Sequence, residues 1–120
     1  MLWAASLYAI LAGIAAAFQV ALVLGAPWGH LIQGGRVPGR LPASGRGLAA
    51  LSAVLLASMA LTMLGAAGLG PVFPAWAKWA TLALTALTTL ANLATPSRPE
   101  RLLWGPVTVA MLATGLIVVL

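Results

Sequence analysis

Four long runs of apolar residues, separated by shorter polar stretches, set the pattern of this chain. The runs cover approximately residues 2–24, 48–69, 75–95 and 102–120. An α-helix rises about 1.5 Å per residue, so about 20 apolar residues are enough to cross a hydrocarbon core of roughly 30 Å. The pattern predicts an all-α membrane protein: a bundle of four transmembrane helices that forms one integral membrane domain over residues 1–120.

The ends of the runs carry helix start signals. Ser44 is a predicted N-cap of the second helix, because its hydroxyl can accept a hydrogen bond from a free backbone N–H. Ser97 and Glu100 have the spacing of a capping box before the fourth run, in which the two residues bond each other's backbone N–H groups. Pro106 then falls inside this helix and is expected to kink it near Leu102; the alternative is a short helix that begins only at Pro106.

Composition favours the same class of protein. Hydrophobic residues make up 62% of the chain and charged residues 6%, whereas a soluble domain carries about 25% charged residues. The chain has no cysteine, and Glu100 is its only acidic residue, so disulfides and thiolate sites are excluded. The net charge of +5 sits beside the apolar runs, which indicates anionic lipid headgroups as partners and no nucleic acid.

The basic residues predict the orientation of the helices. The first run has no Lys or Arg before it and is too long for the apolar part of a signal peptide, so we expect it to remain as a span. If all four runs span, five of the six basic residues share one side. Basic loops stay in the cytoplasm, which predicts both termini outside and a location in the bacterial inner membrane. Lys78 is the one basic residue on the other side.

The predicted cytoplasmic loop at residues 25–47 is the longest polar stretch, and it holds the only histidine. We expect this loop and the connection before the fourth run to contact anionic lipid or a partner protein. The candidate residues are Trp28, His30, Arg36, Arg40, Arg46, Arg98 and Arg101. All five tryptophans lie at the ends of apolar runs, as in an aromatic belt at the membrane interface: Trp3, Trp28, Trp76, Trp79 and Trp104.

Small and polar residues predict the faces along which the helices pack. Ala5, Ala9, Ala12, Ala16 and Gln19 recur at helical spacing in the first run, and Ala49, Ala53, Ala57 and Ala60 do so in the second. In the third run, one face carries Thr81, Thr85, Thr88 and Asn92.

Gln19 and Asn92 lie at similar predicted depth, which allows a hydrogen bond between them. A threonine hydroxyl can bond to its own helix, whereas we expect an amide to need another partner. Both amides are therefore expected to point into the bundle or into a protomer interface and to be hydrogen-bonded there. The alternative is that they line a polar path for a permeant or a ligand.

Catalytic chemistry is scarce in the sequence. Ser44, His30 and Glu100 fall on one predicted side, as a Ser-His-Glu triad requires, but nothing around Ser44 resembles a nucleophile elbow. One histidine and one glutamate are too few for a zinc site with three or four protein ligands. We expect no cofactor, no metal and no enzymatic activity.

Three short stretches carry a resemblance to known proteins. They are Gly25 to Gly29; Gly34-Gly35 with Leu41-Pro42; and Asn92-Leu93 through Ser97 to Arg101 and on to Trp104-Gly105-Pro106. With these stretches the chain resembles a group of small, uncharacterised four-helix bacterial membrane proteins. The resemblance implies a fold and a topology but no activity.

Two functions fit these observations. The first is a non-catalytic accessory or scaffold protein that packs against other membrane subunits or itself and binds anionic lipid through its basic loops. The second is a small oligomeric transporter or channel lined by Gln19 and the polar face of the third run. No titratable group is predicted at membrane depth, which argues against proton coupling.

Overall fold

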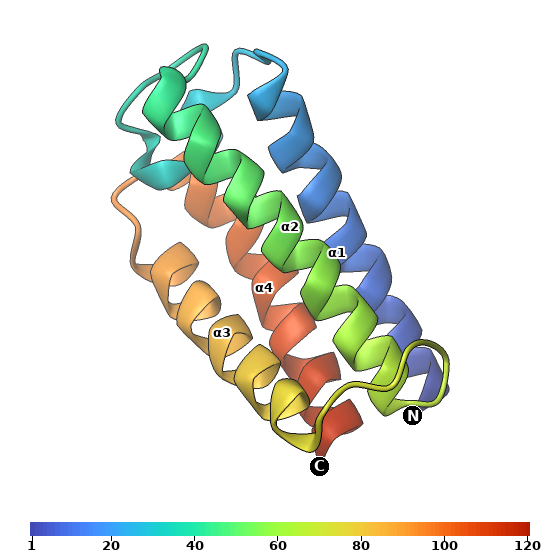
Figure 1. The fold of residues 1–120 in the computed structure, drawn as a ribbon. Coiled ribbons are helices and arrows are strands. Elements are labelled where there is room, and N and C mark those ends of the chain that lie inside the picture. The colour runs from blue at the N-terminus through green and yellow to red at the C-terminus, as the bar shows by residue number, and fades with distance from the viewer.

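The structure is a computed structural model that describes residues 1–120. It is all-helical, as the sequence predicts, and four long helices lie side by side in an elongated bundle (Figure 1). The helices are α1 (Leu2–Val23), α2 (Ala43–Ala66), α3 (Ala75–Ala94) and α4 (Arg98–Val119), and the short 3-10 turns η1 (Gly29–Leu31) and η2 (Gln33–Gly35) lie between α1 and α2.

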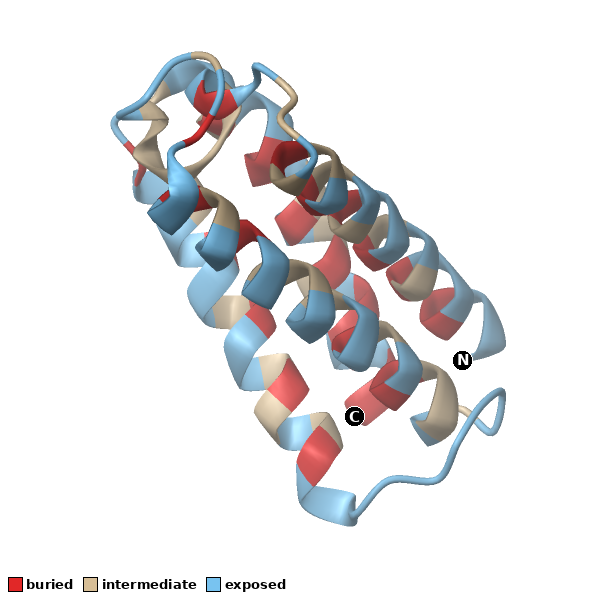
Figure 2. Ribbon diagram, turned by 45° about the horizontal axis from the view of Figure 1, so that its top comes forward, coloured by how far each residue is buried: buried red, intermediate tan, exposed pale blue.

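Three of the helices, α1, α2 and α4, are long and apolar enough to cross a membrane. Large apolar side chains such as Leu51, Val54 and Ile10 are more than half exposed along them, and exposed residues cover the outside of the bundle (Figure 2). These three helices confirm the prediction of a membrane protein with transmembrane helices, whereas the fourth predicted span is not confirmed. The 20-residue α3 is not among the candidate spans, because Lys78, Asn92 and its threonines lower its hydropathy.

The start of α2 differs from the prediction. The helix begins at Ala43, with Pro42 as the N-cap and no capping bond from a side chain. Ser44 therefore lies inside the first turn and is not the N-cap, so that prediction was wrong. Pro42 has φ −67° and ψ 172°, and its carbonyl already accepts from Arg46 N. A proline with its fixed φ starts the helix here without a side-chain cap.

The start of α4 confirms half of the predicted capping box. Ser97 Oγ accepts from Glu100 N at 3.3 Å. Glu100 does not bond back to Ser97; its Oε2 accepts from Gly34 N at 3.3 Å, in the loop between α1 and α2. Pro106 lies inside α4, which is continuous from Arg98, so the alternative of a helix beginning at Pro106 was wrong.

The bundle packs tightly around small residues of α1. Ala5 and Ala12 are fully buried, as predicted, while Ala9 and Ala16 lie half-buried at the edge of the packed face. Tyr8 is also fully buried. A Cβ on Gly115 of α4 would lie 3.4 Å from its ring, so the glycine leaves room for the aromatic side chain.

The packing face of α2 is only partly the predicted one. Ala49 is fully buried, Ala53 and Ala60 are half-buried, and Ala57 is exposed. The side chains that fill the core from α2 are instead Met59 and Met63. Methionine is long and flexible, so it reaches the core from a position where alanine cannot.

The two arginine-bearing connections meet at one end of the bundle, and both termini and the α2–α3 connection lie at the other (Figure 1). Two hydrogen bonds join the arginine-bearing connections: Ser97 Oγ donates to His30 O at 2.9 Å, and Gly34 N donates to Glu100 Oε2. Lys78, in the first turn of α3, belongs to the opposite end. We call the end formed by residues 25–47 and 96–101 the arginine end.

Candidate functional site: a cavity between the four helices and the arginine end

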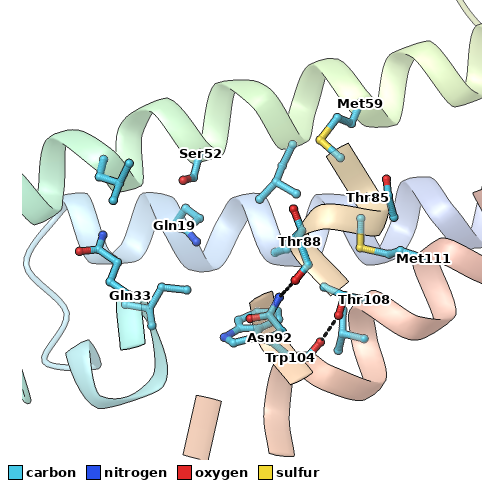
Figure 3. A pocket seen from close by; sticks show the side chains of 15 residues that line it. Gln19, Gln33, Ser52, Met59, Thr85, Thr88, Asn92, Trp104, Thr108 and Met111 are labelled. Carbon is cyan, nitrogen blue, oxygen red and sulfur yellow. Dashed lines mark hydrogen bonds between the residues drawn. The ribbon is translucent and has the colours of Figure 1, made fainter. Parts of the chain in front are cut away.

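A cavity of about 230 Å³ lies between the four helices, next to the arginine end. All four helices and η2 contribute to its wall, which contains no charged side chain. Two of the lining side chains, Gln19 and Trp104, are buried, at 8% and 6% exposed, and we call them the floor of the cavity. Two others, Leu48 of α2 and Thr88 of α3, are exposed, and we call them its rim. The polar side chains in the wall are Gln19, Gln33, Ser52, Thr85, Thr88, Asn92 and Thr108 (Figure 3).

Gln19 and Asn92 both face this cavity, as expected, but they do not bond to each other (Figure 3). Asn92 Nδ2 donates to Thr88 O of its own helix at 3.0 Å. The expectation that an asparagine amide needs a partner outside its helix was therefore wrong. Gln19 Oε1 is buried and has no hydrogen-bond partner, so its expected bond is absent.

The polar face of α3 is rotated relative to the prediction. Thr81, Thr85 and Thr89 are the buried threonines, and Thr88 is exposed. Positions four residues apart stay close to one line along a helix, and α4 packs along that line: Thr89 Oγ1 also donates to Thr108 O at 3.1 Å. The sequence could not show whether Thr88 or Thr89 would be buried, because both positions lie near the predicted face.

The threonine hydroxyls of α3 are largely satisfied within the helix. Thr85, Thr88 and Thr89 each donate to the carbonyl four residues earlier, at 2.7–2.8 Å. Such back-bonding lets a hydroxyl sit in an apolar region at little cost. Two interhelical bonds add to it: the bond of Thr89 to Thr108 O, and one between Tyr8 Oη and Thr85 Oγ1, which lie 2.7 Å apart.

Three aromatic rings support the floor of the cavity. Phe18 of α1 stacks on Trp28 with ring centroids 5.3 Å apart, and it meets Trp104 edge-on at 4.9 Å.

Trp104 is buried, so its predicted place in an interfacial belt was wrong. Its Nε1 is buried without a partner. The other four tryptophans are 40–68% exposed, as a belt requires.

Trp104 is buried because α4 begins four residues earlier than the apolar run suggested. With the helix starting at Arg98, position 104 lies in its second turn and faces α1 instead of ending a span. The sequence offered one signal for this outcome: the capping residues Ser97 and Glu100 had already placed the helix start well before Trp104.

The predicted lipid-binding residues divide into exposed and structural ones. Arg36, Arg40 and Arg98 are exposed. Arg46 is half-buried and its Nε has no partner, whereas Arg101 Nη1 donates to Thr95 O at 2.9 Å, at the end of α3. The latter bond satisfies a carbonyl that the helix end leaves free. Arg101 is thus partly occupied in holding the fold, and Arg46 is less accessible to lipid than the three exposed arginines.

Trp28 and His30 are both exposed in the loop of the arginine end. His30 contributes its backbone carbonyl to the contact with Ser97. No hydrogen bond joins the side chains of Ser44, His30 and Glu100, because Ser44 is exposed in the first turn of α2 and Glu100 is turned towards Gly34. The structure does not assemble them as a triad.

Sequence reasoning missed three residues of this region. Tyr8 makes the bond between α1 and α3, Trp104 forms part of the cavity floor, and Gln33 Nε2 donates to Gly45 O at 2.9 Å, tying η2 to the start of α2. Tyr8 is the only tyrosine in the chain. Its place inside an apolar run was the one sequence signal that its hydroxyl would need a partner within the bundle.

Comparison of the chain with models of protein families, with curated proteins and with solved structures finds no match. Function must therefore be inferred from the arginine end and from the cavity.

Proposed function

We propose that the chain is a non-catalytic, four-span protein of the bacterial inner membrane that binds anionic lipid headgroups through its arginine end. It acts as an accessory or scaffold subunit, packing against other membrane proteins or against further copies of itself. Both termini lie outside and the arginine end faces the cytoplasm.

The threonines of α3 support a fourth span, because their hydroxyls donate to carbonyls of their own helix. Hydropathy counts each threonine as polar, yet their hydroxyls bond to their own helix and cost little in hydrocarbon. The opposite face of α3 is apolar, with Leu87 and Leu90 more than 60% exposed. Lys78 sits in the first turn, where its chain can extend to the interface.

The distribution of charge at the arginine end carries the lipid-binding proposal. Arg36, Arg40 and Arg98 are exposed, while the one acidic residue, Glu100, is 5% exposed. The surface charge at this end is therefore positive only. Each basic residue near an anionic membrane surface contributes about 1 kcal/mol of attraction, and the positive-inside rule places such loops in the cytoplasm.

Small exposed residues support packing against a partner helix. Ser6, Gly13 and Ala17 are exposed on one side of α1, and a Cβ on Gly13 would meet no atom within 4 Å. Membrane helices associate where small residues allow close approach of the backbones.

The alternative of a transporter or channel has the cavity in its favour, since Gln19, Thr85 and Asn92 all line it. Within one protomer, however, the polar lining does not continue to the far end of the bundle. There Tyr8, Met63 and Val118 are buried and pack in one apolar cluster. The packing role is therefore the better supported function.

Lipid retention tests the proposal. Arg36→Gln, Arg40→Gln and Arg98→Gln remove only exposed charges, so the fold is expected to survive. In native mass spectrometry from nanodiscs containing phosphatidylglycerol, we expect each change to lower anionic-lipid affinity roughly fivefold. Lys78→Gln, a single change at the opposite interface, is the matched comparison and should lower lipid binding no more than one arginine change does, and far less than the triple arginine change. Equal retention by the triple arginine variant and the control would contradict lipid binding at this end.

Co-purification from native membranes tests the accessory role separately. A stable partner protein at fixed stoichiometry supports it. A homo-oligomer alone, with solute flux in vesicles that Gln19→Leu alters, would favour the transporter instead.

A further inference from the structure

The cavity between the helices adjoins a second hollow at the arginine end. This hollow has a volume of about 420 Å³ and lies between the long loop and the first two turns of α2. Ile32, Gln33 and Leu48 line both spaces. Leu48 is 50% exposed, so a molecule that lies over its side chain reaches the hollow and the cavity at once. The two spaces can therefore hold one ligand.

The two spaces differ in charge. The hollow is lined by one charged residue, Arg36, and by the hydroxyl-bearing Ser44, and both are exposed. No charged residue lines the cavity, and most of the surface that its wall presents is apolar. Its threonines do not change this, because the hydroxyls of Thr85, Thr88 and Thr108 donate to carbonyls of their own helices. A ligand that fits both spaces has an anionic end and an apolar end.

The cavity has the length and the volume for a single acyl chain. Its wall follows α2 from Leu48 to Met59, which is about 16 Å at a rise of about 1.5 Å per residue. This length is about half of a hydrocarbon core of roughly 30 Å, which is the depth of one leaflet. An engineered cavity of about 150 Å³ holds benzene, so one of about 230 Å³ has room for about nine carbon atoms. That is a large part of one acyl chain and too little for two.

The cavity opens towards the bilayer between α2 and α3. Its rim residues Leu48 and Thr88 are exposed, and Ser52 of α2 and Asn92 of α3 lie on its two sides (Figure 3). In addition, α2 contacts α3 far less than it contacts α1. The chain of a neighbouring lipid can thus enter sideways. Its atoms restore the dispersion contacts that the wall of a void lacks.

We infer that these two spaces bind one anionic phospholipid, with its phosphate group at Arg36 and Ser44 and one acyl chain in the cavity between α2 and α3. The second chain stays in the bilayer, outside Leu48. The inference rests on the proposed binding of anionic lipid at the arginine end, and it adds a defined site for one lipid molecule. Arg40 and Arg98 line neither space, so they attract further lipids only at the surface.

Native mass spectrometry of the full-length protein from nanodiscs containing phosphatidylglycerol tests the inserted chain. The wild type should retain one phosphatidylglycerol about tenfold more tightly than further lipids. Ser52→Leu places a larger side chain in the cavity wall, so the first lipid should then bind as weakly as the others. Ser58→Leu is the matched control, because Ser58 is an exposed serine of α2 that lines neither space. It should retain the tight lipid.

A photoreactive lipid locates the chain in the wild-type protein, so this measurement does not depend on the folding of a variant. Phosphatidylglycerol with a diazirine in the middle of one chain is irradiated in the same nanodiscs, and the labelled residues are identified by peptide mass spectrometry. An inserted chain should label Leu56 and Val107, which line the cavity. Leu51 and Val54, which are exposed on the outside of α2, should be labelled less.

Retention of the tight lipid by Ser52→Leu, or labelling of the outward residues alone, would overturn the inference. The arginine variants separate this result from a failure of the proposed function. If Arg36→Gln, Arg40→Gln and Arg98→Gln still lower lipid binding, the surface attraction stands and only the inserted chain is ruled out. If they do not, the arginine end does not bind anionic lipid, and both proposals fail.

Discussion

Tyr8 and Thr85, 77 positions apart in the sequence, are joined by a hydrogen bond of 2.7 Å between their hydroxyl oxygens, and both side chains are almost completely buried. Thr85 uses its own hydrogen to bond Thr81 O, so Tyr8 is the donor. The bond connects α1 with α3 across the interior of the bundle.

Tyr8→Phe should destabilise the protein modestly, because it removes this one bond and leaves Thr85 bonded to Thr81. Interhelical bonds in membrane proteins contribute about 0.6 kcal/mol and rarely more than about 1.7 kcal/mol. Unfolding of Tyr8→Phe, Thr85→Val and the double variant in mixed micelles measures the coupling. Thr88→Val is the control: its hydroxyl bonds only to Leu84 O, so its effect should add to that of Tyr8→Phe. Simple additivity for Tyr8 and Thr85 would show that the bond contributes nothing.

Gln19→Leu should leave the empty protein as stable as the wild type or more stable. The side-chain oxygen of Gln19 is buried without a partner, and an unpaired buried acceptor costs about 1–3 kcal/mol. Thr89→Val is the contrasting variant, since Thr89 donates to Thr108 O across the α3–α4 interface; it should lower stability by about 0.6 kcal/mol. Loss of stability in Gln19→Leu in the absence of any added ligand would mean that the amide has a partner after all.

Glu100→Leu should loosen the long loop of the arginine end. The change leaves Gly34 N without its acceptor, and hydrogen bonds to charged groups contribute about 1.5–3 kcal/mol. We expect faster trypsin cleavage after Arg36 and Arg40, which are exposed in this loop. Glu100→Gln, which keeps a carbonyl oxygen for Gly34, should be cleaved at nearly the wild-type rate. Identical cleavage of the leucine and glutamine variants would rule out this role of the carboxylate.

Gly29→Ala should be strongly destabilising, whereas Gly13→Ala should not. A Cβ on Gly29 would collide with the carbonyl oxygens of Val37 and Gly39, and the second of these accepts from Gly29 N at 2.8 Å. A Cβ on Gly13 would meet nothing, and alanine in mid-helix is favoured over glycine by about 0.5–1 kcal/mol. Thermal unfolding midpoints of the two variants provide the comparison. A Gly29→Ala midpoint equal to that of the wild type would contradict the close loop packing.

The sides of the membrane on which the two termini lie decide together whether α3 spans. Four spans place Met1 and Leu120 on the same side, and three spans place them on opposite sides. We expect alkaline phosphatase fused after Leu120 to be active and a green fluorescent protein fused there to be dark, because the C-terminus is predicted to be periplasmic. A fluorescent C-terminal fusion would overturn the four-span proposal or the orientation.

The sequence by itself determined that the chain forms long, mostly apolar helices. Long apolar runs bounded by glycine, proline and basic residues leave the backbone no way to satisfy its polar groups in lipid except a helix. The same runs, connected in order and antiparallel, bring Arg36, Arg40 and Arg98 to one end and Lys78 to the other. These features depend on local composition and chain direction, so no knowledge of the packing was needed.

Only the tertiary structure decided which faces of the helices meet. α1 and α2 are apolar nearly all round, so their small residues marked the inward sides only in part: Ala5 and Ala12 are buried as predicted, whereas Ala57 is exposed. Tyr8 could not be matched to Thr85 before α3 was placed. Trp104 turned inward because α4 begins at Arg98, and Glu100 bonded Gly34 instead of Ser97 because the long loop folds back over α4. The cavity likewise exists only where four helices and η2 fail to fill the space between them. Contacts between distant segments depend on the shape of both partners, and hydrophobicity along a single chain does not encode that shape.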